Sequence, residues 1–298
     1  MNTLKSWSVA GLRVTKIPEQ ESSNVSARRL FPSWDVDKLR SDKAVCQAAA
    51  LNCREGSLAL STHSWLVESG GKIILIDAAS GNDKNRPDNP KFHLMQSGWM
   101  SALRSTGVRP DDVDAVVLTH LHVDHVGWST VMRDNSWVPA FPRACYYFSA
   151  RELRFYSEPA NVCPPSKGAI EDSIIPVVKA GLGSLIDNLT DEILSGFKIH
   201  RTPGHSVDHL SFSFSHGGET ALFWGDVLHS PIQVAHPEWN TSFCEFPAEA
   251  ARSRKSMLRF ALETNALVFT SHFPGTSAGR VVAGSTGLSW HSEQEQPL

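Results

Sequence analysis

A short stretch near the middle of the chain concentrates side chains that bind metal ions. Within six residues it carries His120, His122, Asp124 and His125, directly after the apolar run Ala115–Leu118. That run predicts a buried strand, which ends where the polar residues begin. Neutral imidazole and carboxylate are the groups through which proteins bind zinc, iron and manganese. A lone histidine is more often a structural loop residue, but four such residues at this density favour a metal site.

The same pattern recurs three times towards the C-terminus, where an apolar run ends at or near a residue that can bind a metal. These residues are His205, Asp226 and His272. Each alone is more often structural. Strands of one sheet that end at the same edge bring such residues together, however, so we expect a cluster there.

Seven candidate ligands are enough for two metal ions. The first ion would take the three histidines His120, His122 and His205. The second would take Asp124, His125 and His272, with Asp226 between the two ions and positions left open for water.

The composition argues against several classes of protein. The 298 residues have a net charge of −3, and lysine and arginine are scattered, which argues against a nucleic-acid partner. We find no apolar run that predicts a membrane span and no secretory signal. Five cysteines, an odd number without a CxxC pair, predict free and mostly buried thiols in a reducing compartment, and hence a cytoplasmic protein.

The first 58 residues carry weak patterns. Alternation over Leu12–Ile17 predicts a first strand. Glu19–Lys43 mixes polar residues with the apolar Leu30, Phe31 and Trp34, which predicts an extended arm with a few anchors. Such an arm would cover a pocket or a partner subunit, or it would be an ordinary ordered loop.

The segment before the histidine cluster alternates between strands and a helix. Trp65–Val67 and Lys72–Ile76 flank Gly70 and Gly71, which predicts a hairpin. Asp77, at its end, is either a turn former or a residue that supports the ligands. Helical spacing around Trp99 ends at Gly107, and a strand follows, so strand, helix and strand alternate as in an α/β fold.

The second half of the chain continues this alternation. Helices are predicted over Ala150–Tyr156, Ile174–Leu189 and Pro247–Glu263, and a strand over Ala144–Phe148. Strict alternation over Leu210–Ser215 predicts a strand with one buried face. After Val282 the tail is polar and is expected to fray. We interpret residues 1–298 as one domain, with 1–58 as arm and first strand and 283–298 as tail.

The motif THLHVDHVG over Thr119–Gly127 resembles the signature of the metallo-β-lactamase superfamily. Thr202–His205, Gly225–Asp226 and Ser271–His272 follow in the order of that family. The resemblance implies an αβ/βα sandwich of two mixed β-sheets flanked by helices. It also implies a binuclear metal site, usually zinc, at one sheet edge, with Asp77 supporting the ligands.

Within the superfamily, several branches fit less well. True β-lactamases of the commonest class carry arginine where His125 stands, and flavodiiron proteins carry glutamate where His122 stands. Acyl-homoserine lactonases usually carry tyrosine where His229 stands. Gly81–Pro87 and Trp224–His229 look most like the branch of methyl parathion hydrolase and related lactonases and esterases.

The resemblance implies a binuclear metal-dependent hydrolase that uses a metal-bridging hydroxide to cleave a small, mostly apolar lactone or carboxylic ester. The alternatives are a phosphotriester hydrolase and, in another class, a mononuclear iron oxidoreductase resembling sulfur dioxygenases. It also implies two divalent metal ions, with zinc expected first, a small-molecule substrate, and a homodimer.

We expect catalytic roles for two residues beside the metals. Asp124 would orient the hydroxide and shuttle its proton, and His229 would donate a hydrogen bond to the developing oxyanion. Thr119 is expected behind the ligands. Trp128 would line the pocket mouth and Phe273 the pocket, and with Trp65 and Trp99 they suggest an apolar pocket.

Overall fold

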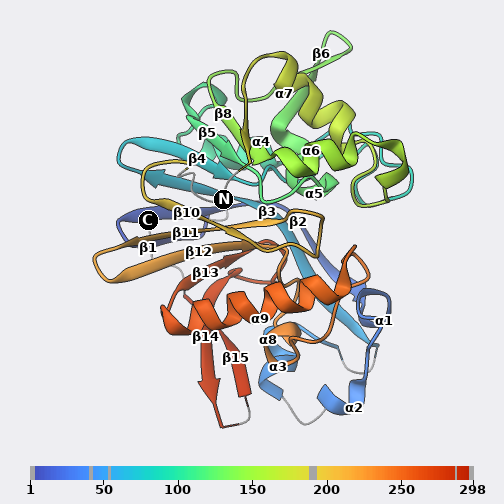
Figure 1. Cartoon of the computed structure of the whole chain (residues 1–298), viewed down its shortest axis with the longest axis vertical. Coiled ribbons are helices and arrows are strands. Elements are labelled where there is room, and N and C mark those ends of the chain that lie inside the picture. The colour runs from blue at the N-terminus through green and yellow to red at the C-terminus, as the bar shows by residue number, and fades with distance from the viewer. Residues whose placement is uncertain (1–3, 40–42, 53–54, 188–192, 286, 295–298) are drawn as a thin grey trace.

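Two mixed β-sheets packed face to face form the centre of the molecule (Figure 1). The structure is a computed structural model that describes every residue except 1–3, 40–42, 53–54, 188–192, 286 and 295–298. In spatial order, the first sheet consists of β1 (Ser6–Val9), β2 (Leu12–Ser26), β3 (Ser57–Ser69), β4 (Lys72–Ile76), β5 (Ala115–Val117), β8 (Cys145–Ser149) and β9 (Gly183–Ile186). From β4 to β9 the strands are parallel, and the others pair antiparallel.

The second sheet follows the chain order. It consists of β10 (Phe197–Arg201), β11 (Leu210–His216), β12 (Glu219–Gly225), β13 (Leu267–Thr270), β14 (Ala278–Gly284) and β15 (Gly287–Ser292). Only the β12–β13 pair is parallel among its described pairs. A small hairpin, β6 (Thr130–Arg133) with β7 (Ser136–Pro139), stands apart from both sheets.

Strand alternation explains how the layers form. In β4, Ile74 and Ile76 enter the core between the sheets, while Leu75 points to the helices outside. In β12, Ala221 and Phe223 enter the same central core. Because successive side chains of a strand point to opposite faces, each central strand contributes to two cores.

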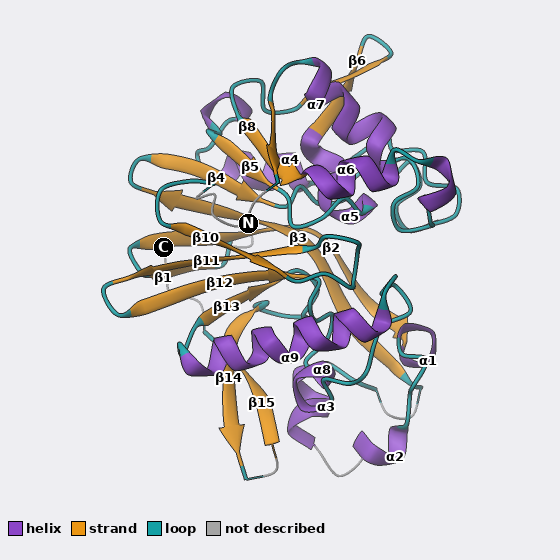
Figure 2. Cartoon of the chain, viewed as in Figure 1, coloured by secondary structure: helices purple, strands orange, loops and turns teal. Residues whose placement is uncertain are grey.

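Helices cover the outer face of each sheet (Figure 2). The first sheet is covered by α4 (Trp99–Ser105), α5 (Val123–Val126), α6 (Ala150–Tyr156) and α7 (Ile175–Lys179). The second is covered by α9 (Pro247–Glu263) and by Val234 of α8 (Ile232–Ala235). These layers confirm the predicted αβ/βα sandwich.

The predicted N-terminal arm is largely wrong. β2 pairs with β3 as far as Ser26, and the chain then forms α1 (Ala27–Leu30), α2 (Val36–Leu39) and α3 (Lys43–Ala48). Leu30 and Phe31 are buried in a small core that also contains Trp239. The long antiparallel pairing with β3 satisfies the backbone of a polar segment that shows little strand character by itself. The prediction also missed β1.

Two predictions in the C-terminal half are wrong in part. The helix expected over Ile174–Leu189 is confirmed only over α7 (Ile175–Lys179); the chain then turns at Gly181, whose φ is +73°, and continues as β9. Residues 188 and 189 lie outside the described residues. The tail expected to fray forms β15 against β14, because Trp290 is buried in the core beneath α9. Both strands are stabilised by partners distant from the local pattern.

Burial differs from prediction at two further places. The first four residues of β11 are buried on both faces, since the strand lies inside the second sheet. Three of the four described cysteines are half-buried and only Cys244 is buried; Cys53 lies outside the described residues. Cys145, Cys163 and Cys244 are free thiols.

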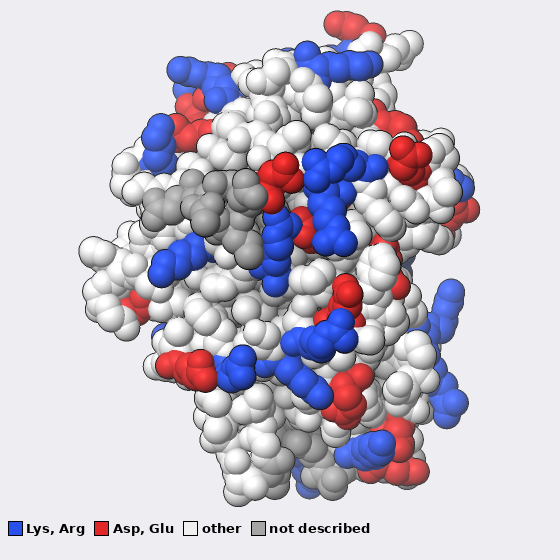
Figure 3. Space-filling view, viewed as in Figure 1, with Lys and Arg blue, Asp and Glu red and all other residues white. Residues whose placement is uncertain are grey.

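Charged side chains of both signs are interspersed on the face shown in Figure 3. The absence of a nucleic-acid partner stays a prediction. Within the described ranges, no helix combines the length and apolar content needed to cross a membrane.

Candidate metal centre

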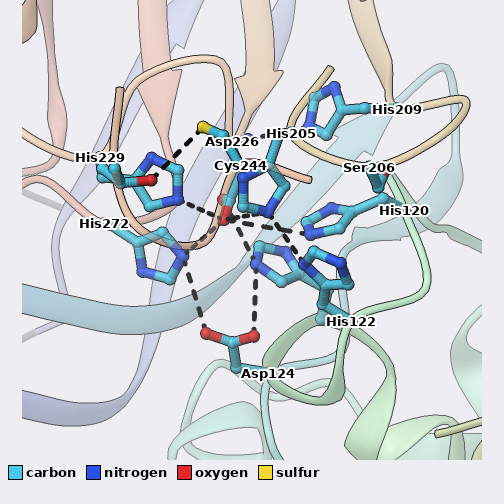
Figure 4. A network of polar contacts seen from close by, with 12 residues as sticks. His120, His122, Asp124, His205, Ser206, His209, Asp226, His229, Cys244 and His272 are labelled. Atoms are coloured by element: carbon cyan, nitrogen blue, oxygen red, sulfur yellow. Dashed lines mark hydrogen bonds and ion pairs between the residues drawn. The ribbon is translucent and has the colours of Figure 1, made fainter. Parts of the chain in front are cut away.

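The segments that follow β5, β10, β12 and β13 carry the seven predicted ligands. The side chains labelled in Figure 4, which include six of these ligands, point toward one another. Six of the seven side chains are buried. Asp124 is the exception, with 21% of its side chain exposed. The structure therefore brings together residues that span more than half of the chain, and it leaves one carboxylate open to solvent.

Gly225 shapes the turn that delivers Asp226. Its φ is +57°, and a Cβ at this position would lie 2.5 Å from His209 Nε2. His209 Nε2 in turn accepts a hydrogen bond from the backbone N–H of Asp226 at 2.9 Å. Only glycine allows this close approach without strain.

The ligand atoms of His120, His122 and His205 form one group, all within 4.8 Å of one another. His122 Nδ1 and His205 Nε2 are 2.9 Å apart. Those of Asp124, His125 and His272 form a second such group. These are the two triads that the sequence predicts.

Asp226 lies between the two groups. Its Oδ2 is 3.2 Å from His205 Nε2 in the first group and 3.1 Å from His272 Nε2 in the second. Its Oδ1 is 3.3 Å from His125 Nε2. A single carboxylate therefore faces both triads, as a bridging ligand would.

Hydrogen bonds behind the second triad set its proton positions. His125 Nδ1 is 2.8 Å from Asp77 Oδ2, and His272 Nδ1 is 2.9 Å from the carbonyl oxygen of Ser61. Both partners are acceptors, so each Nδ1 carries the proton and donates it. Each Nε2 then faces the centre, and in the neutral ring it carries the lone pair that binds a metal.

Thr119 fixes which ring nitrogen of His120 carries the proton. The Thr119 hydroxyl donates to Asp77 Oδ2 at 2.9 Å, so its oxygen accepts from His120 Nδ1, also at 2.9 Å. His120 Nε2 is thereby left with a lone pair directed into the centre. Asp77 thus lies behind two ligands, His120 and His125, as expected of a supporting residue.

Glu245 holds His122 in the opposite tautomer. His122 Nε2 donates to Glu245 Oε1 at 2.9 Å, which leaves Nδ1 unprotonated towards His205. The same oxygen accepts hydrogen bonds from the Tyr156 hydroxyl at 2.6 Å and from Cys163 Sγ at 3.2 Å. The sequence analysis missed Glu245 and Tyr156, since neither ends a strand nor belongs to a motif.

Glu152 is a third residue that the sequence analysis missed. Its buried carboxylate accepts hydrogen bonds from the backbone N–H of Leu121 at 2.7 Å and of Asp208 at 3.1 Å, and from the Ser206 hydroxyl. It therefore ties the loop of His120 and His122 to the loop of His205. Its position three residues after the helix-capping Ser149 resembled an ordinary capping residue.

The electrostatics of the cluster fit cations. Burial and the neighbouring imidazoles hold the pKa of His120 and His205 well below the usual value, so both are neutral. Burial alone would lower the pKa of His125, but Asp226, Asp77 and Asp124 raise it well above the usual value. Two neutral imidazoles, and carboxylates that favour positive charge beside them, are what a divalent metal requires.

Buried polar atoms without a hydrogen-bond partner also indicate a metal site. His120 Nε2, His125 Nε2 and Asp226 Oδ1 are buried without a hydrogen-bond partner in the described part of the chain. Burying such atoms unpaired is costly, and cations placed among them would satisfy all three. The seven residues therefore fit two metal ions.

His229 belongs to the same cluster. Its ring stacks on that of His272 at 5.4 Å and 8°, and its Nε2 lies 3.1 Å from Asp226 Oδ2. Neither ring nitrogen has a hydrogen-bond partner within the described ranges. A histidine in this state is available to a ligand or substrate in the centre.

The predicted aromatic pocket is wrong. Trp128 stacks on Trp99 in the core outside the first sheet, and its indole N–H donates to Glu19. Trp65 is buried between the sheets, and Phe273 is buried beneath α9. These side chains pack the three cores, because the apolar runs that carry them also fill the sandwich.

Comparisons with known proteins agree with this geometry. Residues 58–272 match the family model described as metallo-beta-lactamase superfamily. The probable metallo-hydrolase YybB of Bacillus subtilis (strain 168) is 22% identical over 184 residues, which are 60% of this chain and 68% of that protein.

Two solved structures share the whole fold. Hydrolase AbOPH of the beta-lactamase superfamily matches with a TM-score of 0.83 and 22% identity, over 100% of this chain and 99% of that one. AidC, a dizinc quorum-quenching lactonase in complex with a product, N-hexanoyl-L-homoserine, matches with a TM-score of 0.77 and 22% identity, over 99% and 98%.

Proposed function

The chain belongs to the metallo-β-lactamase superfamily, and from this membership we propose that it is a binuclear metal-dependent hydrolase. Its substrate would be a small, mostly apolar lactone or carboxylic ester. The observation that carries the proposal is the arrangement of two ligand triads on either side of Asp226. The inner ring nitrogens of His120, His122, His125 and His272 face this centre, because hydrogen bonds hold their outer nitrogens.

His120, His122 and His205 would hold one divalent ion, and Asp124, His125 and His272 the other, with Asp226 shared. Zinc is the first expectation, and the dizinc lactonase AidC with the same fold supports it. When bound, such ions activate water as a nucleophile near neutral pH and polarise the oxygen of a carbonyl group.

Asp124 would handle the proton of the attacking water. Its two carboxylate oxygens are 3.8 Å from His125 Nε2 and 3.7 Å from His272 Nε2, and its partial exposure lets solvent reach it. A carboxylate in this place can orient water, accept its proton and pass it to the leaving oxygen.

His229 would stabilise the negative charge that develops on the substrate. Its ring nitrogens are buried and make no hydrogen bond in the described part of the chain, and Nε2 lies 3.1 Å from Asp226 Oδ2. A ring N–H aimed at a developing oxyanion stabilises the transition state more than the ground state. Lactones and esters both develop this charge, which supports either substrate.

Elemental analysis combined with a hydrolysis panel tests the proposal. The purified protein is expected to hold about two divalent ions per chain and to hydrolyse a γ-lactone or an aryl ester from a panel that also contains a phosphotriester. Chelation should abolish turnover, zinc should restore it, and Asp226→Asn should hold less metal than wild type.

The panel also separates the alternatives. Turnover of the phosphotriester alone would replace the lactone and ester assignment with the phosphotriester one. A single iron, oxygen consumption and no hydrolysis would overturn the hydrolase proposal in favour of an iron oxidoreductase on this fold.

A further inference from the structure

The segment Thr241–Phe246 lies against the metal centre and is held there by the backbone. Ser242 N–H donates to Leu30 O at 2.8 Å, and Glu245 N–H donates to His205 O at 3.1 Å. Phe246 N–H donates to Gly204 O at 2.8 Å. Glu245 also holds the ring of ligand His122. The segment is therefore anchored both to the N-terminal helices and to the loop of a predicted ligand.

Phe243 is the exposed aromatic residue of this segment. Its side chain is 44% exposed, and its ring lies 6.1 Å from the ring of His229. The ring of His229 is in turn 4.8 Å from that of His205 and 5.4 Å from that of His272. The ring of His229 thus lies between the exposed apolar side chain of Phe243 and the predicted ligands.

Isolated apolar side chains on a surface are common and need no explanation by themselves. The other large apolar side chains exposed on the described residues lie on segments without any cluster residue: Leu94, Met132, Val178, Leu185 and Leu262. The tryptophans expected to line the pocket are buried in the cores. Phe243 therefore provides an apolar wall that the buried tryptophans do not.

We propose that Phe243 determines substrate specificity by packing its ring against the apolar chain of an acyl group bound at the metal centre. This inference rests on the proposed function, because it assumes an ester or lactone whose carbonyl group lies beside Asp226 and His229. Each methylene group that the ring removes from water strengthens binding, so the preference for a substrate rises with its chain length.

A series of p-nitrophenyl esters tests this role, with acyl chains from acetate through butanoate to octanoate. Phe243→Ala is expected to raise KM about tenfold for the octanoate and less than twofold for the acetate, the size that a hydrophobic contact can supply. Phe243→Leu, which keeps an apolar side chain, should fall between. Leu262→Ala, which truncates another exposed apolar side chain, on α9, is the matched control and should change no KM value.

An equal change in KM for all chain lengths, or the same chain-length dependence in Leu262→Ala, would overturn the role of Phe243. Calorimetric titration of the metal-loaded protein with sodium acetate and sodium octanoate gives a second readout that needs no turnover. Phe243→Ala should lose the preference for octanoate. If the wild type hydrolyses nothing, the proposed function fails, while this titration still decides the inference about Phe243.

Discussion

Four histidines that are predicted ligands have a hydrogen-bond partner on the ring nitrogen that points away from the centre. Asp77, Thr119, Glu245 and the carbonyl group of Ser61 fix which nitrogen carries the proton. This choice matters because a neutral imidazole has one donor and one acceptor, and only the acceptor can bind a cation. Mutation of such supporting residues typically weakens metal binding or activity about 10–100-fold.

Glu245 provides a direct test of this reasoning. Glu245→Ala removes the acceptor of His122 Nε2–H and is expected to weaken metal binding about 10–100-fold. Glu245→Gln should weaken it less, because its carbonyl oxygen still accepts. Competition against a chromophoric chelator measures the affinity without using activity.

The control for Glu245 is Glu249→Ala, which removes an exposed carboxylate that pairs with Arg252 on the surface of α9. Its metal affinity should match that of the wild type. Equal affinities of Glu245→Ala and Glu249→Ala would show that the hydrogen bond to His122 does not support the metal.

A variant of His229 tests whether this residue is a catalytic hydrogen-bond donor or a metal ligand. If its N–H stabilises the oxyanion, His229→Ala should lower kcat about 10²–10³-fold while the metal content stays at the wild-type level. His216→Ala, at an exposed position in β11, is the control. A loss of metal from His229→Ala would contradict the donor role and make His229 an eighth ligand.

At the scale of elements, the strands position the chemistry and the turns after them aim it. β5, β12 and β13 end at His120, Asp226 and His272 or within a few residues of them. Glu152 at the start of α6 then joins two ligand loops through three hydrogen bonds. Small changes in these turns should therefore affect both stability and metal binding.

Gly225 lies in a turn with little room for a side chain. A methyl group there would meet His209 Nε2 at 2.5 Å and Thr119 Cβ at 2.9 Å. Gly217 has a similar φ of +60° but nothing within 4 Å of the added Cβ. Gly217→Ala should cost roughly 1–2 kcal/mol for the left-handed backbone alone.

Gly225→Ala should destabilise the protein by roughly 1–3 kcal/mol more than Gly217→Ala, because the added methyl group also overpacks the core. Urea unfolding of both variants measures the difference. Metal content should fall only in Gly225→Ala, since its turn carries Asp226. Equal stabilities would show that the neighbouring side chains yield without cost.

At the scale of the whole molecule, a buried ionic cluster joins the loop after β4 to the segment before α7. Lys84 is fully buried; its ammonium group donates to Thr130 Oγ1 at 2.6 Å and lies 3.5 Å above the ring of Trp137. Asp172 pairs with Arg86 at 2.6 Å and with Lys84 at 3.5 Å. Burial lowers the pKa of Lys84 to about 7, although Asp172 opposes the shift.

Lys84 should make stability depend on pH in the alkaline range. Its pKa of about 7 in the folded chain lies below the ordinary value of 10.5. Between these values the unfolded chain binds a proton that the folded chain does not, so the free energy of unfolding rises with pH. The cost of burying the charge is complete below pH 7 and absent above pH 10.5.

Urea unfolding of wild type and Lys84→Met at pH 7, 8, 9 and 10 measures this contribution. The free energy of unfolding of the wild type minus that of Lys84→Met should increase as the pH rises. Parallel curves would show that Lys84 stays protonated in the folded chain throughout.

Much of the site could be predicted because its signals are local. The predicted ligands follow apolar runs within a few residues, and these runs form strands whose alternating side chains fill two cores. Helices α6 and α9 have the predicted bounds, since a continuous helical pattern satisfies its own backbone within one segment. The αβ/βα sandwich follows from the signature together with this alternation.

The tertiary structure decided what depends on distant partners. β1, β9 and β15 form because neighbouring strands supply their hydrogen bonds, and their own sequence patterns do not predict them. Glu245 and Glu152 act on the ligands across long sequence distances. The tryptophans near the motifs are buried while Phe243 is exposed, because space between packed layers, and not residue type, determines which aromatic side chains reach a site.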